Sequence, residues 1–148
     1  MHSYINFLAH CVFSTKNREK FLKPDIQSRL WPYLGGIAWE NKMKAISVGG
    51  VADHVHILLS IPSTLSLSKA IQIIKGNSSK WIRDTFLNMN HFAWQEGYGA
   101  FSIGISDTFR TIRYIQNQEK HHQSKTFQEE LVLFLRKQGM NYDKMIFS

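Results

Sequence analysis

The sequence predicts an α+β fold, a ferredoxin-like (RRM-like) antiparallel sheet with two helices on one face and a C-terminal, tyrosine-bearing helix over the other. Three observations predict it. The expected elements follow the order strand, helix, strand, strand, helix, strand, and further helices come after them. The strand-like segments alternate apolar and polar residues, as half-buried strands do. The 148 residues contain no repeat and no linker rich in Pro, Gly or Ser, so we expect one domain over residues 1–148.

Short segments with a period of two, bounded by turn-forming residues, predict the strands. Gly49 and Gly50 should bend or bulge the second of them, and Pro62 stops the third. The four strands are predicted at residues 4–14, 44–51, 54–61 and 100–106.

Apolar residues at helical spacing predict the helices. Pro32 and the Gly35-Gly36 pair should kink or shorten the first, and Asp107 is the expected N-cap of the third. The four helices are predicted at residues 25–37, 67–86, 107–122 and 126–137.

Charge and cysteine content restrict the class of protein. Eighteen Lys and Arg against eleven Asp and Glu give a net charge of +7, which favours a polyanionic partner such as nucleic acid. The single cysteine, Cys11, excludes an internal disulfide and a cysteine-rich zinc cluster. Because the N-terminus does not read as a secretion signal and no run of 18 apolar residues occurs, we expect a cytoplasmic protein that does not span a membrane.

The third predicted strand carries a pair of histidines. Because alternate side chains of a strand share a face, His54 and His56 should project together, about 7 Å apart along the chain, opposite an apolar face. Two imidazoles placed in this way can hold one divalent ion, with Asp53 supporting a ligand or only shaping the turn. On this pattern alone, a satisfied, half-buried strand pair is the commoner interpretation.

The third predicted helix carries a second set of candidate residues. At 100° per residue, Tyr114, Gln118 and His121 fall on one side, away from a packing stripe. The stripe consists of Phe109, Ile112 and Ile115. A helix laid over the bare face of the sheet would bring the Gln118 amide toward the two strand histidines and set Tyr114 beside them. His121 and His122 are alternatives to Gln118 as a third metal ligand, and their other interpretation is as solvent-exposed histidines.

Four segments in this order make the chain resemble a known family. They are His-Val-His at 54–56, Lys-Gly-Asn-Ser-Ser-Lys at 75–80, residues 94–102 from Trp94 to Ser102, and Tyr-Ile-Gln-Asn-Gln at 114–118. The set resembles the insertion-sequence 200/605 family, single-tyrosine transposases of the HUH endonuclease superfamily, named for its histidine-hydrophobic-histidine motif. The resemblance covers nearly the whole chain.

The resemblance implies a role for each matching residue. Tyr114 would be the nucleophile, and His54, His56 and Gln118 would bind Mg²⁺ or Mn²⁺. The tyrosine would form a 5′-phosphotyrosine and release a 3′-hydroxyl, which conserves the energy of the bond and makes a nucleotide cofactor unnecessary. Family members act as homodimers on single-stranded DNA with terminal hairpins, often with the tyrosine helix completing the partner's site. The residues do not distinguish an active element from a domesticated relative.

Basic and aromatic side chains are candidates for contacts with DNA. Lys16 and Arg18 follow the first strand, and Lys69, Lys80 and Arg83 share one side of the second helix, although charged residues are more often simply solvated. The aromatic residues Phe92, Trp94 and Tyr98 could stack on unpaired bases or pin their loop to the core.

Two other functions remain open at this point. A non-catalytic nucleic-acid-binding module with an RRM-like sheet needs only positive charge and loop aromatics. A metal-dependent nuclease that uses water would cut DNA without forming a protein adduct. The tyrosine and the histidine pair favour the transposase, because binding alone does not require that combination.

Overall fold

The structure is a computed structural model that describes residues 2–122 and 125–140. Its centre is a four-stranded antiparallel sheet in the order β2-β3-β1-β4. The strands are β1 (Leu8–Ser14), β2 (Lys44–Val51), β3 (His54–Ser60) and β4 (Gly99–Ile103). This strand order and the alternation of strands and helices confirm the predicted ferredoxin-like sheet.

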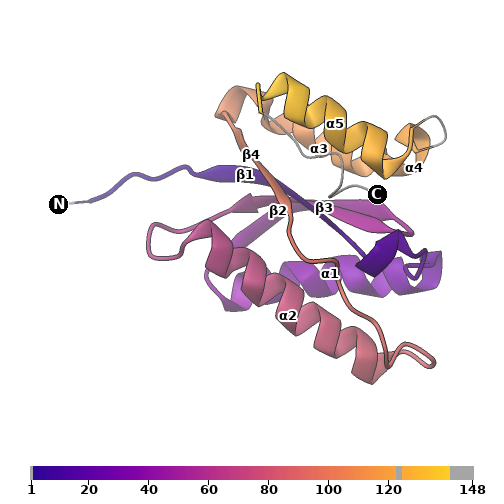
Figure 1. The fold of residues 1–148 in the computed structure, drawn as a ribbon. Coiled ribbons are helices and arrows are strands. Elements are labelled where there is room, and N and C mark those ends of the chain that lie inside the picture. Colours follow the sequence, from indigo (N-terminus) through magenta and orange to yellow (C-terminus); the bar gives the residue numbers. More distant parts are fainter. Residues whose placement is uncertain (1, 123–124, 141–148) are drawn as a thin grey trace.

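Helices form a layer on each side of the sheet (Figure 1). One layer holds α1 (Pro24–Glu40) and α2 (Leu67–Thr85). The other holds α3 (Thr108–Gln116), α4 (Gln118–His121) and α5 (Phe127–Lys137). Short 3₁₀ helices, η1 (Lys16–Arg18) and η2 (Ile105–Asp107), follow β1 and β4. No helix among the described residues is both long enough and apolar enough to cross a bilayer.

The main hydrophobic core lies between the sheet and α1 and α2. Alternation along β3 turns Val55, Ile57 and Leu59 toward these helices, and all three are almost completely buried. Odd-numbered residues of β1, such as Cys11 and Phe13, join them. On the other face, Ile115 of α3 packs against Leu8 and Leu58 of the sheet in a smaller apolar cluster.

The first helix is longer and more regular than the sequence predicted. It continues as one element through Pro32, Gly35 and Gly36 to Glu40, with no interruption at the proline. Its apolar side, Ile26, Leu30, Leu34 and Ile37, is buried in the main core. Proline has no backbone N–H, so one helical hydrogen bond is lost at Pro32. The packing of the apolar side compensates for this loss and keeps the backbone helical.

Several predicted strand details are corrected. The first strand begins at Leu8 rather than at residue 4, because Leu8 pairs with Ser60 and Ile103, which are the last residues of β3 and β4. The fourth strand accordingly ends at Ile103, before η2. The irregular pairing in β2 lies between Ala45 and Ser47, whereas Gly49 and Gly50 belong to the regular ladder.

The predicted helix over residues 107–122 is divided at Asn117 into α3 and α4. Asp107 occupies the N-cap position without a capping hydrogen bond from its side chain. Ile112 and Ile115 pack toward the sheet as predicted, but Phe109 is 78% exposed and does not belong to the packing stripe. The last helix, α5, has nearly the predicted bounds and begins with a capping box between Thr126 and Glu129.

Candidate functional site

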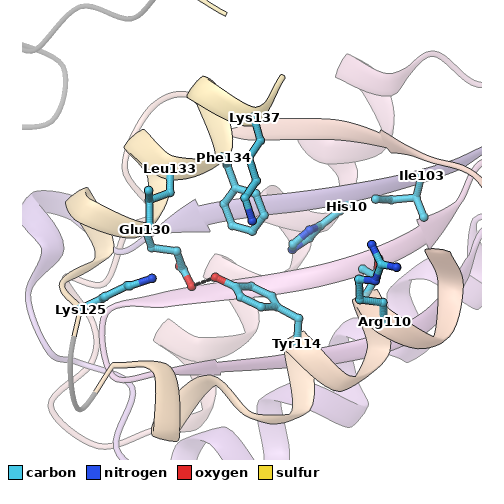
Figure 2. A pocket seen from close by; sticks show the side chains of 10 residues that line it. His10, Ile103, Arg110, Tyr114, Lys125, Glu130, Leu133, Phe134 and Lys137 are labelled. Atoms are coloured by element: carbon cyan, nitrogen blue, oxygen red, sulfur yellow. Dashed lines mark hydrogen bonds between the residues drawn. The ribbon is translucent and has the colours of Figure 1, made fainter. Parts of the chain in front are cut away.

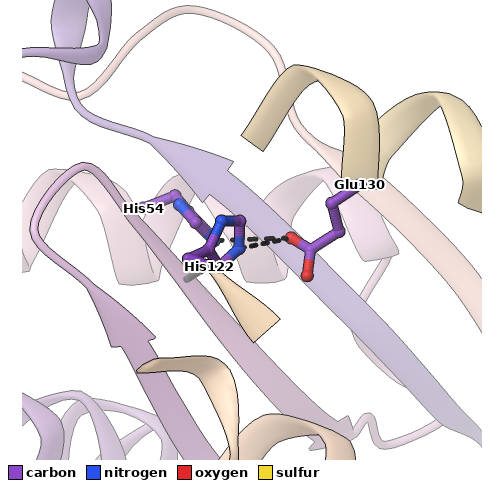
Figure 3. Close-up of side chains that lie close together, drawn as sticks. All are labelled: His54, His122 and Glu130. Atoms are coloured by element: carbon purple, nitrogen blue, oxygen red, sulfur yellow. Dashed lines mark ion pairs between the residues drawn. The ribbon is translucent and has the colours of Figure 1, made fainter. Parts of the chain in front are cut away.

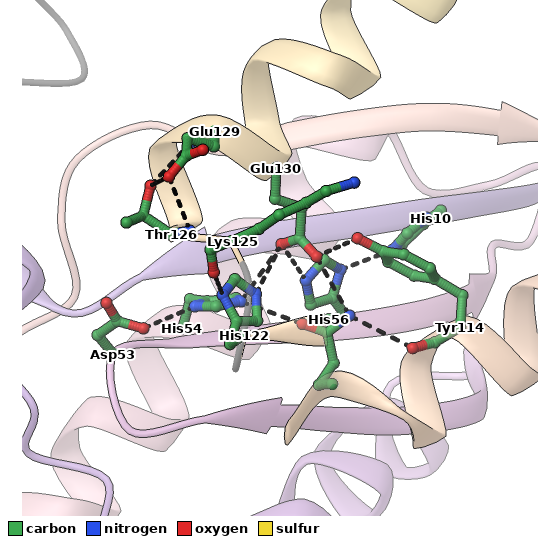
Figure 4. A network of polar contacts seen from close by, with 11 residues as sticks. His10, Asp53, His54, His56, Tyr114, His122, Lys125, Thr126, Glu129 and Glu130 are labelled. Carbon is green, nitrogen blue, oxygen red and sulfur yellow. Dashed lines mark hydrogen bonds and ion pairs between the residues drawn. The ribbon is translucent and has the colours of Figure 1, made fainter. Parts of the chain in front are cut away.

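The two strand histidines lie on the same face of the sheet, beneath α3, α4 and α5. His54 and His56 are both fully buried, and their ring centroids are 5.1 Å apart. They point away from the main core because their neighbours Val55 and Ile57 occupy it. The polar cluster around them is defined here as the cluster of His10, Asp53, His54, His56, Tyr114, Gln118, His122 and Glu130 (Figure 4).

His54 is held from both sides of its ring. Its Nδ1 donates a hydrogen bond of 2.7 Å to the Asp53 carboxylate, and its Nε2 lies 3.2 Å from Oε1 of Gln118. Burial alone would lower the pKa of His54, but the hydrogen bonds to Asp53 and Glu130 outweigh it and raise the pKa to about 8. Asp53 thus fixes the ring so that Nε2 faces the cluster, which is the usual arrangement around a ligating histidine.

His56 has a histidine as its second partner. Its Nδ1 is hydrogen-bonded to Nε2 of His10 at 2.8 Å, and its Nε2 is 3.0 Å from Oε1 of Glu130. Burial lowers the pKa of His56 to about 4 and that of His10 to about 3. Both rings are therefore neutral near pH 7, the form in which an imidazole nitrogen can bind a metal ion.

The carboxylate of Glu130 lies at the centre of the polar cluster. It projects from α5, is only 4% exposed, and its Oε1 is within 3.4 Å of the Nε2 atoms of His54, His56 and His122. Its Oε2 accepts hydrogen bonds from the Tyr114 hydroxyl and from Nε2 of Gln118. Burial opposes the charge, but the surrounding histidines hold the pKa of this carboxyl well below its ordinary value.

Tyr114 reaches the cluster from the last turn of α3. Its hydroxyl donates to Glu130, and its ring stands edge-on to the rings of His10, His56 and Phe134. Burial, followed by the negative charge of Glu130, raises the pKa of the Tyr114 phenol well above its ordinary value. The phenol is consequently protonated at neutral pH in this conformation.

The structure brings Tyr114, His54, His56 and Gln118 into one cluster, as the sequence predicted. Gln118 begins α4, directly after the break in the helix, and its Nε2 also donates to the backbone carbonyl of Tyr114 at 3.3 Å. The roles of these four residues in catalysis and in metal binding stay predictions.

The residues of the cluster fit a divalent ion. Candidate ligand atoms of His54, His122 and Glu130 all lie within 4.8 Å of one another (Figure 3). The buried Nε2 of His122 has no partner with hydrogen-bond geometry, although Oε1 of Glu130 is 3.2 Å away. Mg²⁺ prefers oxygen ligands and Mn²⁺ also accepts imidazole, and the cluster offers both kinds of atom. Of the two alternative ligands, His122 faces the site, while the side chain of His121 lies outside the described part of the chain.

Two residues of the polar cluster, Glu130 and His10, were not predicted from the sequence patterns. Glu130 interrupts the apolar side of α5, between Phe127 and Phe134, and a carboxylate in such a stripe is the signal that could have identified it. His10 shares a strand face with Val12, which pairs with His56, so the strand register would have placed it beside the site.

The predicted DNA-contacting residues fall into two groups. Lys16 and Arg18 lie in η1, where Arg18 donates to the Gln128 side chain of α5 at 3.5 Å. Lys69, Lys80 and Arg83 lie on α2. This helix covers the face of the sheet opposite α3, which carries Tyr114 (Figure 1). The second group is therefore not part of the polar cluster.

The loop aromatics mostly pin their loop to the core. Phe92 and Trp94 are buried and contact each other, Trp94 packs edge-on against Phe13, and its indole nitrogen donates to Ser78. Only Tyr98 among the three is substantially exposed, at 42%. Stacking on a base is thus restricted to Tyr98 within this trio.

Comparisons with known proteins agree with this fold. A crystal structure from Deinococcus radiodurans R1 of a protein assigned as a transposase superposes with a TM-score of 0.64 at 22% identity, covering 80% of this chain and 95% of that one. The REP-associated tyrosine transposase bound to a REP hairpin gives a TM-score of 0.60 at 16% identity, covering 82% of this chain and 72% of the other. The fold is thus the one found in DNA transposases of known structure.

The sequence comparisons identify the family. The family profile described as "Transposase IS200 like" matches residues 3–118. The transposase for insertion sequence element IS200 of Salmonella typhimurium is 28% identical over 123 residues, covering 79% of this chain and 80% of the relative. The ISDra2 transposase TnpA of Deinococcus radiodurans is 22% identical over 114 residues, covering 74% and 81%. The chain belongs to the IS200-like transposase family, whose members are DNA-cleaving enzymes.

Proposed function

We propose that this protein cleaves and rejoins single-stranded DNA at insertion-sequence ends through a covalent 5′-phosphotyrosine at Tyr114. The observation that carries the proposal is the convergence of the Tyr114 hydroxyl, the paired His54 and His56 and the amide of Gln118 within one buried cluster. A non-catalytic nucleic-acid-binding module would not need a tyrosine hydroxyl beside two buried histidines and a glutamine amide. The family membership of the chain supports the same conclusion.

The covalent step exchanges one phosphate ester for another. Oη of Tyr114 forms a bond to phosphorus, the P–O3′ bond breaks, and the departing 3′ oxygen takes up a proton. Oε2 of Glu130 accepts the hydrogen bond of the phenol and orients its oxygen, and the phenolic proton passes to water as the bond to phosphorus forms. A 3′-hydroxyl of another strand reverses the reaction, so joining requires no nucleotide cofactor.

The imidazoles of His54 and His56 and the amide oxygen of Gln118 are the proposed ligands of Mg²⁺ or Mn²⁺, with His122 and Glu130 also within reach. A divalent ion held there would neutralise negative charge on the scissile phosphate and so activate phosphorus toward a weak nucleophile. Asp53 and His10 hold the two strand imidazoles in the required orientation through their second ring nitrogens.

The proposed substrate is single-stranded DNA with terminal hairpins, and the proposed assembly is a homodimer acting inside the cell. The net charge of +7 supports a polyanionic partner. Lys16, Arg18, Lys69, Lys80 and Arg83 are the proposed contacts. Because the last three lie on α2, across the sheet from Tyr114, they suit a part of the DNA remote from the cleaved phosphate.

A denaturing gel tests the proposal. The protein is incubated with Mn²⁺ and with single-stranded oligonucleotides tiled over the DNA that flanks its gene. We expect a protein–DNA adduct that maps to Tyr114 by mass spectrometry and is lost in Tyr114→Phe. Tyr4→Phe removes a hydroxyl from a side chain that is 93% exposed and should form the adduct normally. Free cut ends without an adduct would indicate a nuclease that uses water, and bound but intact DNA would indicate a binding module.

A further inference from the structure

A cavity of about 390 Å³ opens between α3 and α5, beside Tyr114 (Figure 2). Its volume lies within the range of small-molecule sites, roughly 300–1,000 Å³. Tyr114 and Glu130 form part of its wall, so the cavity gives access to the phenol, whereas His54 and His56 behind it are fully buried.

Three cations surround the cavity. Arg110 of α3, Lys125 just before α5 and Lys137 at the end of α5 point their nitrogen atoms toward the same space (Figure 2). The carboxylate of Glu130 is already contacted by three imidazoles, and the ion pair of 3.5 Å between Arg110 and Asp107 is exposed. The local charge therefore favours an anion with more than one charge.

Much of the remaining wall is apolar and aromatic. Ile103, Leu133 and Phe134 line this part, and His10 and Thr111 complete the cavity. Phe134 is fixed by stacking on Phe101, with ring centroids 5.3 Å apart. A rigid aromatic and aliphatic wall next to cations suits a ligand that has a flat apolar part and phosphate groups.

We propose that this cavity binds one nucleotide of the single-stranded DNA, adjacent to the phosphate that Tyr114 attacks. The base lies against Phe134 and Leu133, and the flanking phosphates are bound by Arg110, Lys125 and Lys137. The proposal rests on the proposed function, because it takes the phenol as the attacking group. In this proposal, residues on and next to α3 and α5 position the DNA strand, and they are different residues from the proposed metal ligands His54, His56 and Gln118.

The test measures the dissociation constant of thymidine 3′,5′-bisphosphate by NMR titration in buffer with EDTA, so that no cleavage takes place. Leu133→Trp fills the cavity from a position that is 38% exposed and should weaken binding about tenfold or more. Leu87→Trp is the matched control, because Leu87 is 90% exposed and lies outside the cavity. It should bind like the wild type.

A second pair of variants tests the charge. Lys137→Gln and Arg136→Gln each remove one positive charge from the last turn of α5, but only Lys137 lines the cavity. We expect Lys137→Gln to weaken binding about fivefold or more and Arg136→Gln to leave it unchanged. An abasic 2-deoxyribose 3,5-bisphosphate should bind more weakly than the nucleotide, because it lacks the base. Equal binding of these two ligands, or equal loss in cavity and control variants, would overturn the proposal.

The adduct assay separates this inference from the proposed function. If Tyr114 forms its adduct but Leu133→Trp and Lys137→Gln bind the bisphosphate like their controls, the nucleotide site is wrong and the transposase mechanism stands. If both cavity variants lose binding and no adduct forms with any DNA, the nucleotide site is retained and the mechanism is wrong.

Discussion

Along β3, consecutive residues are equally buried but lie in opposite environments. Val55 and Ile57 pack against α1 and α2 in the main core, whereas His54 and His56 point into the polar cluster beneath α3, α4 and α5. All four side chains are at most 1% exposed. The two faces of the sheet therefore exclude water equally, but one surrounds its side chains with apolar groups and the other with hydrogen-bonding groups.

This difference has an energetic consequence. Each large aliphatic side chain in the main core stabilises the fold by about 1.5–3 kcal/mol relative to exposure. A buried imidazole or carboxylate costs free energy unless it is hydrogen-bonded, and the cluster satisfies most of its polar atoms internally. We infer that the face toward α1 and α2 supplies the stability that allows the other face to bury polar groups for chemistry.

The largest expected effect comes from the polar face. His56→Ala should lower the rate of metal-dependent DNA cleavage by at least about 100-fold. Removing a group that only orients a metal ligand typically lowers activity about 10- to 100-fold, and removing a ligand itself should lower it more. The rate is measured from adduct formation on a denaturing gel, with Mn²⁺ affinity followed by isothermal titration. His91→Ala is the control, since His91 is exposed and far along the chain from the cluster. Cleavage by His56→Ala at the wild-type rate in the presence of a chelator would remove the metal from the mechanism.

The neighbouring residue on the apolar face should behave in the opposite way. Ile57→Ala should lower the free energy of unfolding by about 2–5 kcal/mol, because it leaves a cavity in the main core. Urea denaturation measures this, and Ile105→Ala, at a position 70% exposed, should stay within about 0.5 kcal/mol of the wild type. The cleavage rate per folded molecule should be unchanged in Ile57→Ala. A selective loss of cleavage in this variant would contradict the division of labour between the faces.

Local sequence patterns predicted the parts of this division that depend on local geometry. Strand periodicity placed His54 and His56 on one face. The spacing of Tyr114 and Gln118 predicted that they lie close together, and they do, although the helix is divided between them at Asn117. His10 and Glu130 could not be placed in this way. Their contacts depend on the register of β1 against β3 and on how α5 packs over the sheet, which no local pattern specifies.

The same limit explains the errors in the element boundaries. Pro32 disfavours a helix locally, yet the burial of Leu30 and Leu34 maintains α1 through it. The predicted bulge at Gly49-Gly50 rested on glycine's flexibility, but the small size of Gly49 matters more, since a β-carbon there would lie 2.5 Å from the carbonyl oxygen of Ile115. Tertiary packing overrode the local preference in both cases.

A substitution at Gly49 therefore tests how α3 is positioned over the sheet, with an expected effect on stability smaller than that of Ile57→Ala. Gly49→Ala should lower the free energy of unfolding by about 1–3 kcal/mol, because the backbone of α3 must move away from β2. Cleavage should decrease as well, since Tyr114 is carried by that helix. Gly35→Ala is the matched control in α1, where a β-carbon meets nothing within 4 Å, and should stabilise the protein by about 0.5–1 kcal/mol. Equal effects of the two substitutions in urea denaturation would show that α3 does not rest on β2 at Gly49.

The smallest expected effect comes from the one titratable side chain of β1 that faces the main core. Burial raises the pKa of the Cys11 thiol to about 12, so the folded protein disfavours the thiolate. Because the unfolded chain releases this proton near pH 9, the contribution of Cys11 to stability is retained below pH 9 and falls as the pH rises toward 12, by about 1 kcal/mol between pH 9 and 10. Cys11→Ala lacks this titration, so its free energy of unfolding should decline less steeply over that interval, as measured by urea denaturation at each pH. Identical slopes in the two proteins would mean that the thiol ionises as readily in the folded chain as in the unfolded one, and that the apolar face excludes water less completely than its packing indicates.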